Sequence, residues 1–230
     1  IQNEYGIPVV PHVLCSRFTK EETEYLLIDL QFLGITNLLL LRGDKAKEDK
    51  RFRPTEGGHE HTTDLEVQVN DYNNGEKIEF IGEKFTYGVA CYPEKHEEAS
   101  NMKTDMEYFK RKIELGANYG VTQMFFDNSK YFAFVEEARK AGIEVPIIPG
   151  IKPFTKLSQL TVVPKTFRCD IPEEFVKEAA KCKNDDEFKE LGVEWCVAQC
   201  KELMTHGVPS IHFYTMGAAN SIRRIAEKIY

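Results

Sequence analysis

A run of four leucines, Leu38 to Leu41, is followed at once by Arg42, Gly43 and Asp44. The run has no polar face, and a short apolar run bounded by turn residues is typical of a strand buried on both sides in a parallel sheet. Gly43 permits a tight turn or the close approach of a ligand to the backbone. Arg42 and Asp44 therefore stand at the carboxyl end of a buried strand, where α/β folds build their sites. A surface ion pair after a core strand is an equally good interpretation of these residues alone.

Strand-like apolar runs alternate with helix-like segments along all 230 residues. Six strands are predicted, at 7–15, 37–41, 87–93, 117–126, 145–150 and 210–215. Helices are predicted at 20–33, from 62, at 105–115, at 128–141, from 155, and at 173–181, 186–206 and 221–229. This alternation predicts an α/β fold with a parallel sheet flanked by helices. A (β/α)8 barrel of the TIM type and an open doubly wound sheet both fit, but no GxGxxG follows any strand to mark a dinucleotide-binding Rossmann fold.

If the fold is a barrel, two strand–helix units are missing from this chain, and each would need roughly 30 residues. The helix-like opening at Gln2 to Glu4 suggests that they precede residue 1. We therefore expect residues 1–230 to form a single catalytic barrel domain that holds strands 3 to 8. Asn73, Asn74 and Gly75 predict a turn that closes a small hairpin-like excursion before Thr86.

Composition excludes several classes of protein. The chain is 42% hydrophobic and 29% charged, as expected for a globular protein, and its net charge of −7 with no basic run argues against nucleic-acid binding. Since no apolar run reaches the roughly 20 residues of a membrane span, we expect no membrane insertion. The six cysteines include no CxxC pair, so we expect buried, reduced thiols and a cytoplasmic protein.

Polar side chains lie in or just beyond nearly every predicted strand end. In a parallel barrel all of these ends open on one face. Packing alone explains the pattern poorly, because buried polar atoms cost free energy unless they are paired. We expect no metal site, and His59 and His61, in a glycine-containing loop, are expected to be solvated. The strand-end residues are His12, Arg42, Asp44, Tyr92, Glu94, His96, Gln123, Asp127, Lys152, His212 and Tyr214.

Six longer motifs carry a resemblance to a known family. They are Leu41–Asp44, Ala90–His96, Lys110–Lys112 with Gly116–Asn118, Thr122–Asp127, Ile148–Pro153 and His212–Met216. In this order and spacing they resemble methylenetetrahydrofolate reductase, and the resemblance covers essentially the whole chain. It implies a (β/α)8 barrel with non-covalent FAD. The activity implied is the reduction of 5,10-methylenetetrahydrofolate to 5-methyltetrahydrofolate with NADH or NADPH, a step of one-carbon metabolism that feeds methionine synthesis.

The resemblance also assigns residues. Two catalytic positions are implied: Asp44, whose carboxylate would disfavour extra negative charge on reduced flavin, and Gln123, whose amide can both donate and accept hydrogen bonds. Asp44, Gln123 and Gln159 match folate contacts. Positions that match flavin contacts are His12, Arg42, Gly43, Asp44, His61, Thr62, Ala90, Tyr92, His96, Asp105 and Lys112.

The chain departs from the family pattern at three places. The general-acid glutamate of the family would precede residue 1. Gly217 to Ala219 replace an Asn-Arg pair whose arginine contacts folate, which leaves Arg223 or Arg224 as candidate substitutes. Val163 stands near the position of an aromatic residue that packs on the folate in some relatives.

Two other functions fit the same residues. One is a non-catalytic barrel remnant that holds flavin or folate but lacks the general acid. The other is a different flavin barrel such as proline dehydrogenase, although the motifs above are not shared with it. Because the chain ends just after the last predicted helix, we favour a bacterial-type, single-domain reductase. A homo-oligomer is compatible with the sequence, and so is either nicotinamide cofactor.

Overall fold

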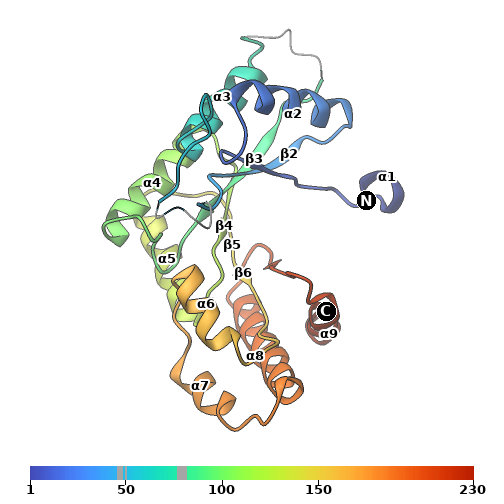
Figure 1. Ribbon diagram of the computed structural model, residues 1–230, viewed down its shortest axis with the longest axis vertical. Coiled ribbons are helices and arrows are strands. Elements are labelled where there is room, and N and C mark those ends of the chain that lie inside the picture. Colours follow the sequence, from blue (N-terminus) through green and yellow to red (C-terminus); the bar gives the residue numbers. More distant parts are fainter. Residues whose placement is uncertain (46–48, 50, 77–81) are drawn as a thin grey trace. The chain divides into compact units, whose positions relative to one another are not determined.

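The computed structural model describes residues 1–45, 49, 51–76 and 82–230 (Figure 1). The chain divides into two compact units. The N-terminal unit consists of Ile1–Ala90 and Tyr108–Gly120, and the C-terminal unit consists of Cys91–Glu107 and Val121–Tyr230.

Five strands form one sheet in which neighbours follow the order of the chain. The strands β1, β2 and β3 pair in parallel, with His12 opposite Leu39 and Asn37 opposite Thr86. The predicted α/β class with a parallel sheet is therefore confirmed. The strands of this sheet are β1 (His12–Leu14), β2 (Asn37–Leu41), β3 (Thr86–Cys91), β4 (Tyr119–Thr122) and β5 (Ile147–Ile148). A second parallel pair joins β6 (Gly150–Ile151) to β7 (His212–Phe213).

The leucine run is the buried strand that the sequence predicts. Leu38 and Leu40 have no exposed surface, and Leu39, which points to the opposite side, is 6% exposed. Burial of alternate residues on both faces explains why the strand has no polar side. The strand β2 therefore lies between β1 and β3 as the centre of the N-terminal unit.

Helices cover this sheet in the N-terminal unit. The helix α2 (Lys20–Phe32) begins with a capping box, in which Thr19 Oγ1 accepts from the Glu22 backbone and Glu22 Oε2 accepts from the Thr19 backbone. The helix α3 (Thr62–Asn73) packs against α2 and β2. A short α1 (Gln2–Tyr5) precedes them, and the second half of α4 (Met102–Leu115) belongs to this unit.

The C-terminal unit is built around α8, which packs against α5, α7 and α9 (Figure 1). Its core is aromatic: the ring centroids of Phe126 and Phe154 lie 4.3 Å apart, and those of Phe154 and Phe175 lie 4.8 Å apart. Stacked rings bury much apolar area in one place, which stabilises this unit. Its helices are α5 (Asn128–Lys140), α6 (Gln159–Phe167), α7 (Glu173–Ala179), α8 (Asp185–Thr205) and α9 (Ala219–Ile229).

Prolines make two strands shorter than predicted. Residues 7–11 are not part of β1, because Pro8 and Pro11 have no N–H to donate to a sheet. His12 therefore opens β1, and the prediction that it lies near the carboxyl end of its strand is wrong. The predicted strand 145–150 is split at Pro149 into β5 and β6, which lie in different sheets.

Other boundaries also differ from the prediction. The strand β4 covers only 119–122 of the predicted 117–126, and α6 begins at Gln159 rather than 155. The helix α4 starts three residues early, because Asn101 Oδ1 accepts from the Thr104 backbone and caps it. Asn74 and Gly75 form a turn, but as the end of α3, and the rest of the predicted excursion includes 77–81, outside the described residues.

All six cysteines lie in the described part of the chain, where none forms a disulfide, and five of them are buried. No helix among the described residues combines the length and apolarity needed to cross a membrane.

Substitution of Gly192 by alanine tests the packing of α8. Alanine favours a helix by roughly 1 kcal/mol over glycine, so propensity alone predicts a more stable protein. A Cβ at this position, however, would overlap the backbone carbonyl of Phe154, which cannot rotate away. We expect Gly192→Ala to lower the free energy of unfolding by about 1–3 kcal/mol in urea titrations. The exposed control Ala198→Gly on the same helix should cost only about 1 kcal/mol. A stabilised Gly192→Ala protein would contradict the predicted contact.

Candidate functional site

The loop after β2 is held by the neighbouring strand. The Ser16 N–H donates to the carbonyl oxygen of Arg42 at 3.0 Å. Gly43 has a φ of 86°, and a Cβ here would overlap Ser16 Oγ, so glycine is required by protein packing as well as by the turn. The guanidinium carbon of Arg42 lies 4.8 Å from the ring centroid of Phe52, while Asp44 is exposed.

The first turn of α3 carries two predicted flavin contacts. His61 is the N-cap, and its backbone N–H donates to Asp64 Oδ2 at 2.9 Å. Thr62 is the first residue of the helix, as the sequence predicts, and it is buried. The side chains of His61 and of His12, at the start of β1, are exposed.

Lys112 ties α4 to the end of β3. Its Nζ donates to the carbonyl oxygen of Ala90 at 2.9 Å, which brings two of the predicted flavin contacts together. The rest of the Ala90 residue is partly exposed, as is Lys112.

Glu66 is a buried carboxyl group that the sequence analysis missed. The residue has no exposed surface, and neither carboxyl oxygen has a hydrogen-bond partner among the residues that the structure describes. Burial raises the pKa of Glu66 to about 8, although the positive charge of Lys112 lowers it in part. Its position next to Leu65 and three residues before Val69, on the buried face of α3, was the sequence pattern that could have revealed it.

In the C-terminal unit, the loop after β3 brings three predicted flavin contacts together. The rings of Tyr92 and His96 meet edge to face, with centroids 4.7 Å apart. The His96 backbone N–H donates to Oδ2 of the buried Asp105 at 2.8 Å. A charge-assisted hydrogen bond of this kind fixes the course of the loop and hence the position of both rings.

Strand ends of this unit are joined by a chain of hydrogen bonds. The Gln123 N–H donates to Cys91 O, and the Gly150 N–H donates to Thr122 Oγ1, each at 2.8 Å. Tyr214 Oη donates to Thr122 O at 2.8 Å. Polar groups at these ends are therefore paired largely with neighbouring backbone, as buried polar atoms require. The side-chain oxygen of Gln123 accepts from the Met124 N–H at 2.9 Å.

Residues near the predicted folate position are also engaged. Oε1 of Gln159 accepts from the backbone N–H groups of Thr155 and Lys156, at 2.7 and 3.2 Å. Both candidate substitutes for the missing arginine bind carboxylates: Arg223 Nε contacts Glu227 at 2.9 Å, and Arg224 contacts Glu190. Val163 is buried in the aromatic core.

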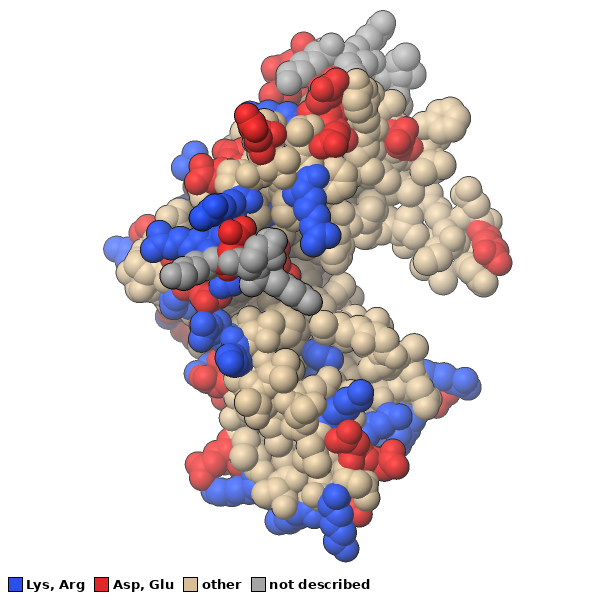
Figure 2. All heavy atoms as spheres, in the orientation of Figure 1, with Lys and Arg blue, Asp and Glu red and all other residues tan. Residues whose placement is uncertain are grey.

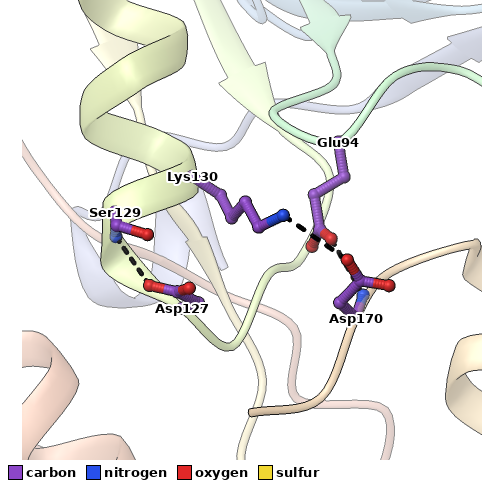
Figure 3. Close-up of polar contacts among 5 residues, drawn as sticks. All are labelled: Glu94, Asp127, Ser129, Lys130 and Asp170. Atoms are coloured by element: carbon purple, nitrogen blue, oxygen red, sulfur yellow. Dashed lines mark hydrogen bonds and ion pairs between the residues drawn. The ribbon is translucent and has the colours of Figure 1, made fainter.

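A polar cluster binds the loop after β3 to the segment between α6 and α7 (Figure 3). Glu94 Oε2 accepts from the Asp170 N–H at 2.9 Å, and Lys130 Nζ lies 3.5 Å from Asp170 Oδ2. Asp127 caps α5 through the Ser129 N–H. Burial disfavours the charged carboxylate and raises the pKa of Glu94 to about 7. The hydrogen bond from the Asp170 N–H lowers this pKa in part, whereas the nearby Asp170 carboxylate raises it further.

A second tie joins the same two segments. Arg168 Nη2 lies 2.9 Å from Glu97 Oε1, so residues 94–97 contact residues 168–170 twice. Sequence analysis selected Glu94 and Asp127 as strand-end residues but missed Lys130 and Asp170, since contacts 40 and 76 residues apart leave no local pattern.

The expectation that His59 is solvated is wrong. The residue is only 2% exposed, and its Nε2 forms a hydrogen bond with Oε1 of Gln68. The amide nitrogen of Gln68 donates in turn to the Lys20 carbonyl oxygen. The histidine packs in the N-terminal unit because the loop turns back at Gly58, whose N–H bonds Thr55 O. Within the described residues, no group of three or more histidine, cysteine, aspartate or glutamate side chains is placed to hold a metal ion.

The charged surface is mixed. On the face that Figure 2 shows, acidic and basic side chains are interspersed, in keeping with the modest net charge of −7. Interspersed charges produce a weak overall field, so recognition of a charged ligand depends on individual residues.

The whole chain matches one known protein family. The family model described as methylenetetrahydrofolate reductase matches residues 1–230. The chain belongs to the methylenetetrahydrofolate reductase family. The resemblance carried by the sequence motifs is thereby confirmed.

Individual reductases show the same similarity. Methylenetetrahydrofolate reductase 1 of Schizosaccharomyces pombe is 32% identical over 230 residues, which is 100% of this chain and 37% of that protein. The 5,10-methylenetetrahydrofolate reductase of Escherichia coli is 31% identical over 221 residues, 95% of this chain and 69% of that protein. The chain thus spans little more than a third of the fungal reductase.

Among solved structures, the chain is similar to an uncharacterized protein from Clostridium thermocellum that binds two copies of 5-methyl-5,6,7,8-tetrahydrofolic acid. The TM-score is 0.62 at 16% identity, over 97% of this chain and 73% of that one. At this identity the similarity shows a shared fold.

The residues assigned from reductase relatives fall into two groups, and their roles stay predictions. Those in the N-terminal unit are His12, Arg42, Gly43, Asp44, His61, Thr62, Ala90 and Lys112, and those in the C-terminal unit are Tyr92, His96, Asp105, Gln123 and Gln159.

Glu66 should make the stability of the protein depend on pH. Its pKa is about 8 in the folded chain against an ordinary 4.5, so between these values the unfolded chain gives up a proton that the folded chain keeps. The free energy of unfolding then falls by up to about 1.4 kcal/mol for each pH unit as the pH rises through this window. Glu66→Gln stays neutral, and we expect it to flatten this decline in urea titrations from pH 5 to 8.

Glu107→Gln, at an exposed position on α4, is the matched control and should keep the wild-type pH dependence. If Glu66→Gln also keeps it, Glu66 is not a protonated group in the folded chain.

Proposed function

We propose that this chain forms the FAD- and folate-binding part of a methylenetetrahydrofolate reductase, which reduces 5,10-methylenetetrahydrofolate to 5-methyltetrahydrofolate in one-carbon metabolism and methionine synthesis. The family match over residues 1–230 carries this proposal. Relatives named as NADPH-dependent in Caenorhabditis elegans and NADH-dependent in Arabidopsis thaliana support a nicotinamide nucleotide as reductant. The fold shared with a protein that binds 5-methyltetrahydrofolate supports folate as the substrate class. We also propose that the parallel sheet belongs to a closed (β/α)8 barrel.

Each of the two units carries side chains whose chemistry suits a part of FAD. Arg42 and Lys112 are cations suited to a diphosphate, and Lys112 is already positioned by the Ala90 carbonyl. Tyr92 offers an aromatic surface, and its loop is fixed through Asp105. The chemistry that FAD supplies when bound is hydride transfer from the nicotinamide to the one-carbon unit of the folate.

This chain's own residues would tune and orient that chemistry. Asp44 is an exposed carboxylate beside Gly43, and near the flavin it would disfavour additional negative charge. Gln123 would orient the ring that stacks on the flavin, with its amide nitrogen as the donor, because its oxygen accepts from Met124. Opening of the folate ring also requires a general acid that protonates the folate nitrogen.

A non-catalytic folate-binding barrel is the second candidate. One observation favours it: Gly217 to Ala219 carry no cation, and the nearby Arg223 and Arg224 bind Glu227 and Glu190. Such a protein would bind folate but would not exchange electrons with a nicotinamide nucleotide.

An absorption spectrum of the purified full-length protein separates these candidates. The reductase should show a flavin spectrum that bleaches under anaerobic NADH or NADPH and recovers when methylenetetrahydrofolate is added. A flavin spectrum that neither nucleotide bleaches would favour the binding-only protein. A protein that remains colourless after incubation with FAD would contradict the flavin assignment.

Asp105 should matter for flavin binding through the loop that it holds. Asp105→Ala removes the acceptor of the His96 N–H, and a hydrogen bond to a charged group contributes roughly 1.5–3 kcal/mol. We expect the dissociation constant of FAD to rise at least about tenfold in fluorescence titrations, and less in Asp105→Asn, which keeps an acceptor oxygen. Asp29→Ala, at an exposed position on α2, is the control. Equal FAD affinity in Asp105→Ala and wild type would rule out this positioning role.

A further inference from the structure

Lys152 is a buried lysine directly after a strand. The strand β6 ends at Ile151, which has no exposed surface, and Lys152 itself is only 5% exposed. Lysine is almost never buried to this extent unless its ammonium group is paired.

No partner for this ammonium group occurs among the described residues. Lys152 makes no hydrogen bond or ion pair with them, and burial is the only cause that lowers its pKa. Lysines of the same unit that do have acidic partners, such as Lys140 and Lys177, are exposed. Folding alone would favour the opposite arrangement, with the unpaired lysine exposed, because an unpaired charge costs the least free energy in water.

The position of Lys152 connects it to the strand-end row of the proposed site. The Tyr214 N–H donates to the Ile151 carbonyl at 2.9 Å, and Tyr214 Oη donates to Thr122 O, the residue before Gln123. Residues alternate between faces along a strand, so Lys152 shares the face of Gly150, against which the ring of Tyr214 packs. A cation therefore lies beyond β6 in the row of strand ends that includes Gln123.

We propose that Lys152 is a substrate-binding residue whose ammonium group pairs with an anionic oxygen of the ligand that enters at these strand ends. The inference rests on the proposed function, which supplies two ligands with such oxygens: the folate, through the carboxylates of its glutamate, and the nicotinamide nucleotide, through its phosphates. Either ligand would provide the negative charge that the described residues do not, and charge-assisted hydrogen bonds are among the strongest polar contacts.

Binding measurements on the full-length protein test this role without relying on turnover. The dissociation constants of 5-methyltetrahydrofolate and of oxidised NAD and NADP are measured by calorimetry for wild type, Lys152→Met and Lys152→Arg. We expect Lys152→Met to weaken one ligand class at least about tenfold, and Lys152→Arg to retain most of the affinity. Lys156→Met, an exposed lysine in the same connection, is the matched control and should bind as wild type. Because Lys152→Met removes a buried charge, it should fold at least as stably.

Tetrahydropteroate, which lacks the glutamate, separates the two sources of the anion. If the folate carboxylate is the partner, the effect of Lys152→Met is present with 5-methyltetrahydrofolate and disappears with tetrahydropteroate. If a phosphate is the partner, only the nucleotide is weakened. Wild-type affinity of Lys152→Met for all ligands would overturn this inference alone, whereas a wild-type protein that binds neither folate nor nucleotide would overturn the proposed function as well.

Discussion

Parallel pairing of adjacent strands is the constraint on which the rest of this structure depends. Once β1, β2 and β3 run in the same direction, their carboxyl ends lie at the same edge of the sheet, and each connection must return through a helix. Backbone hydrogen bonds continue the pairing just beyond β1: the Cys15 N–H donates to the Leu41 carbonyl oxygen, and the Ser16 N–H donates to the Arg42 carbonyl oxygen. The backbone at Arg42 is therefore fixed by the sheet itself, which is the rigidity that a binding site needs.

Burial, rather than net charge, determines which ionisable groups behave unusually here. Glu66 and Glu94 have raised pKa values because desolvation disfavours their charged forms, and Lys152 has a lowered pKa for the same reason. By contrast, ion pairs on the surface helices, such as that between Lys177 and Glu173, are exposed and contribute little. Of these groups, Glu94 and Lys152 follow strands, which makes them candidates for functional residues.

Much of the fold could be predicted from the sequence because its patterns are local. Leu38 to Leu41 predicted a buried central strand, and the alternation of apolar runs with helices predicted a parallel sheet. Prolines made two strands shorter than predicted. A proline has no N–H to donate to a neighbouring strand, and the sequence alone does not show which residues need that hydrogen bond. The burial of His59 depended on its hydrogen bond with Gln68, nine residues away, which no local pattern reveals. The burial of Glu66, by contrast, could have been inferred from its place beside Leu65 on the apolar face of α3. Family motifs supplied the candidate site residues, whose roles stay predictions, but they did not indicate that Gly43 also leaves room for the side chain of Ser16.

The hydrogen bonds of Gln159 engage one end of its side-chain amide and leave the other end for a further partner. Its side-chain oxygen is occupied by the N–H groups of Thr155 and Lys156, which it holds at the entry to α6. In the proposed folate contact the amide would therefore offer only its N–H groups, and it would favour a ligand atom that presents a lone pair over one that presents a proton. Since the same oxygen holds the segment that leads into α6, a substitution of Gln159 would alter the local fold together with the proposed ligand contact.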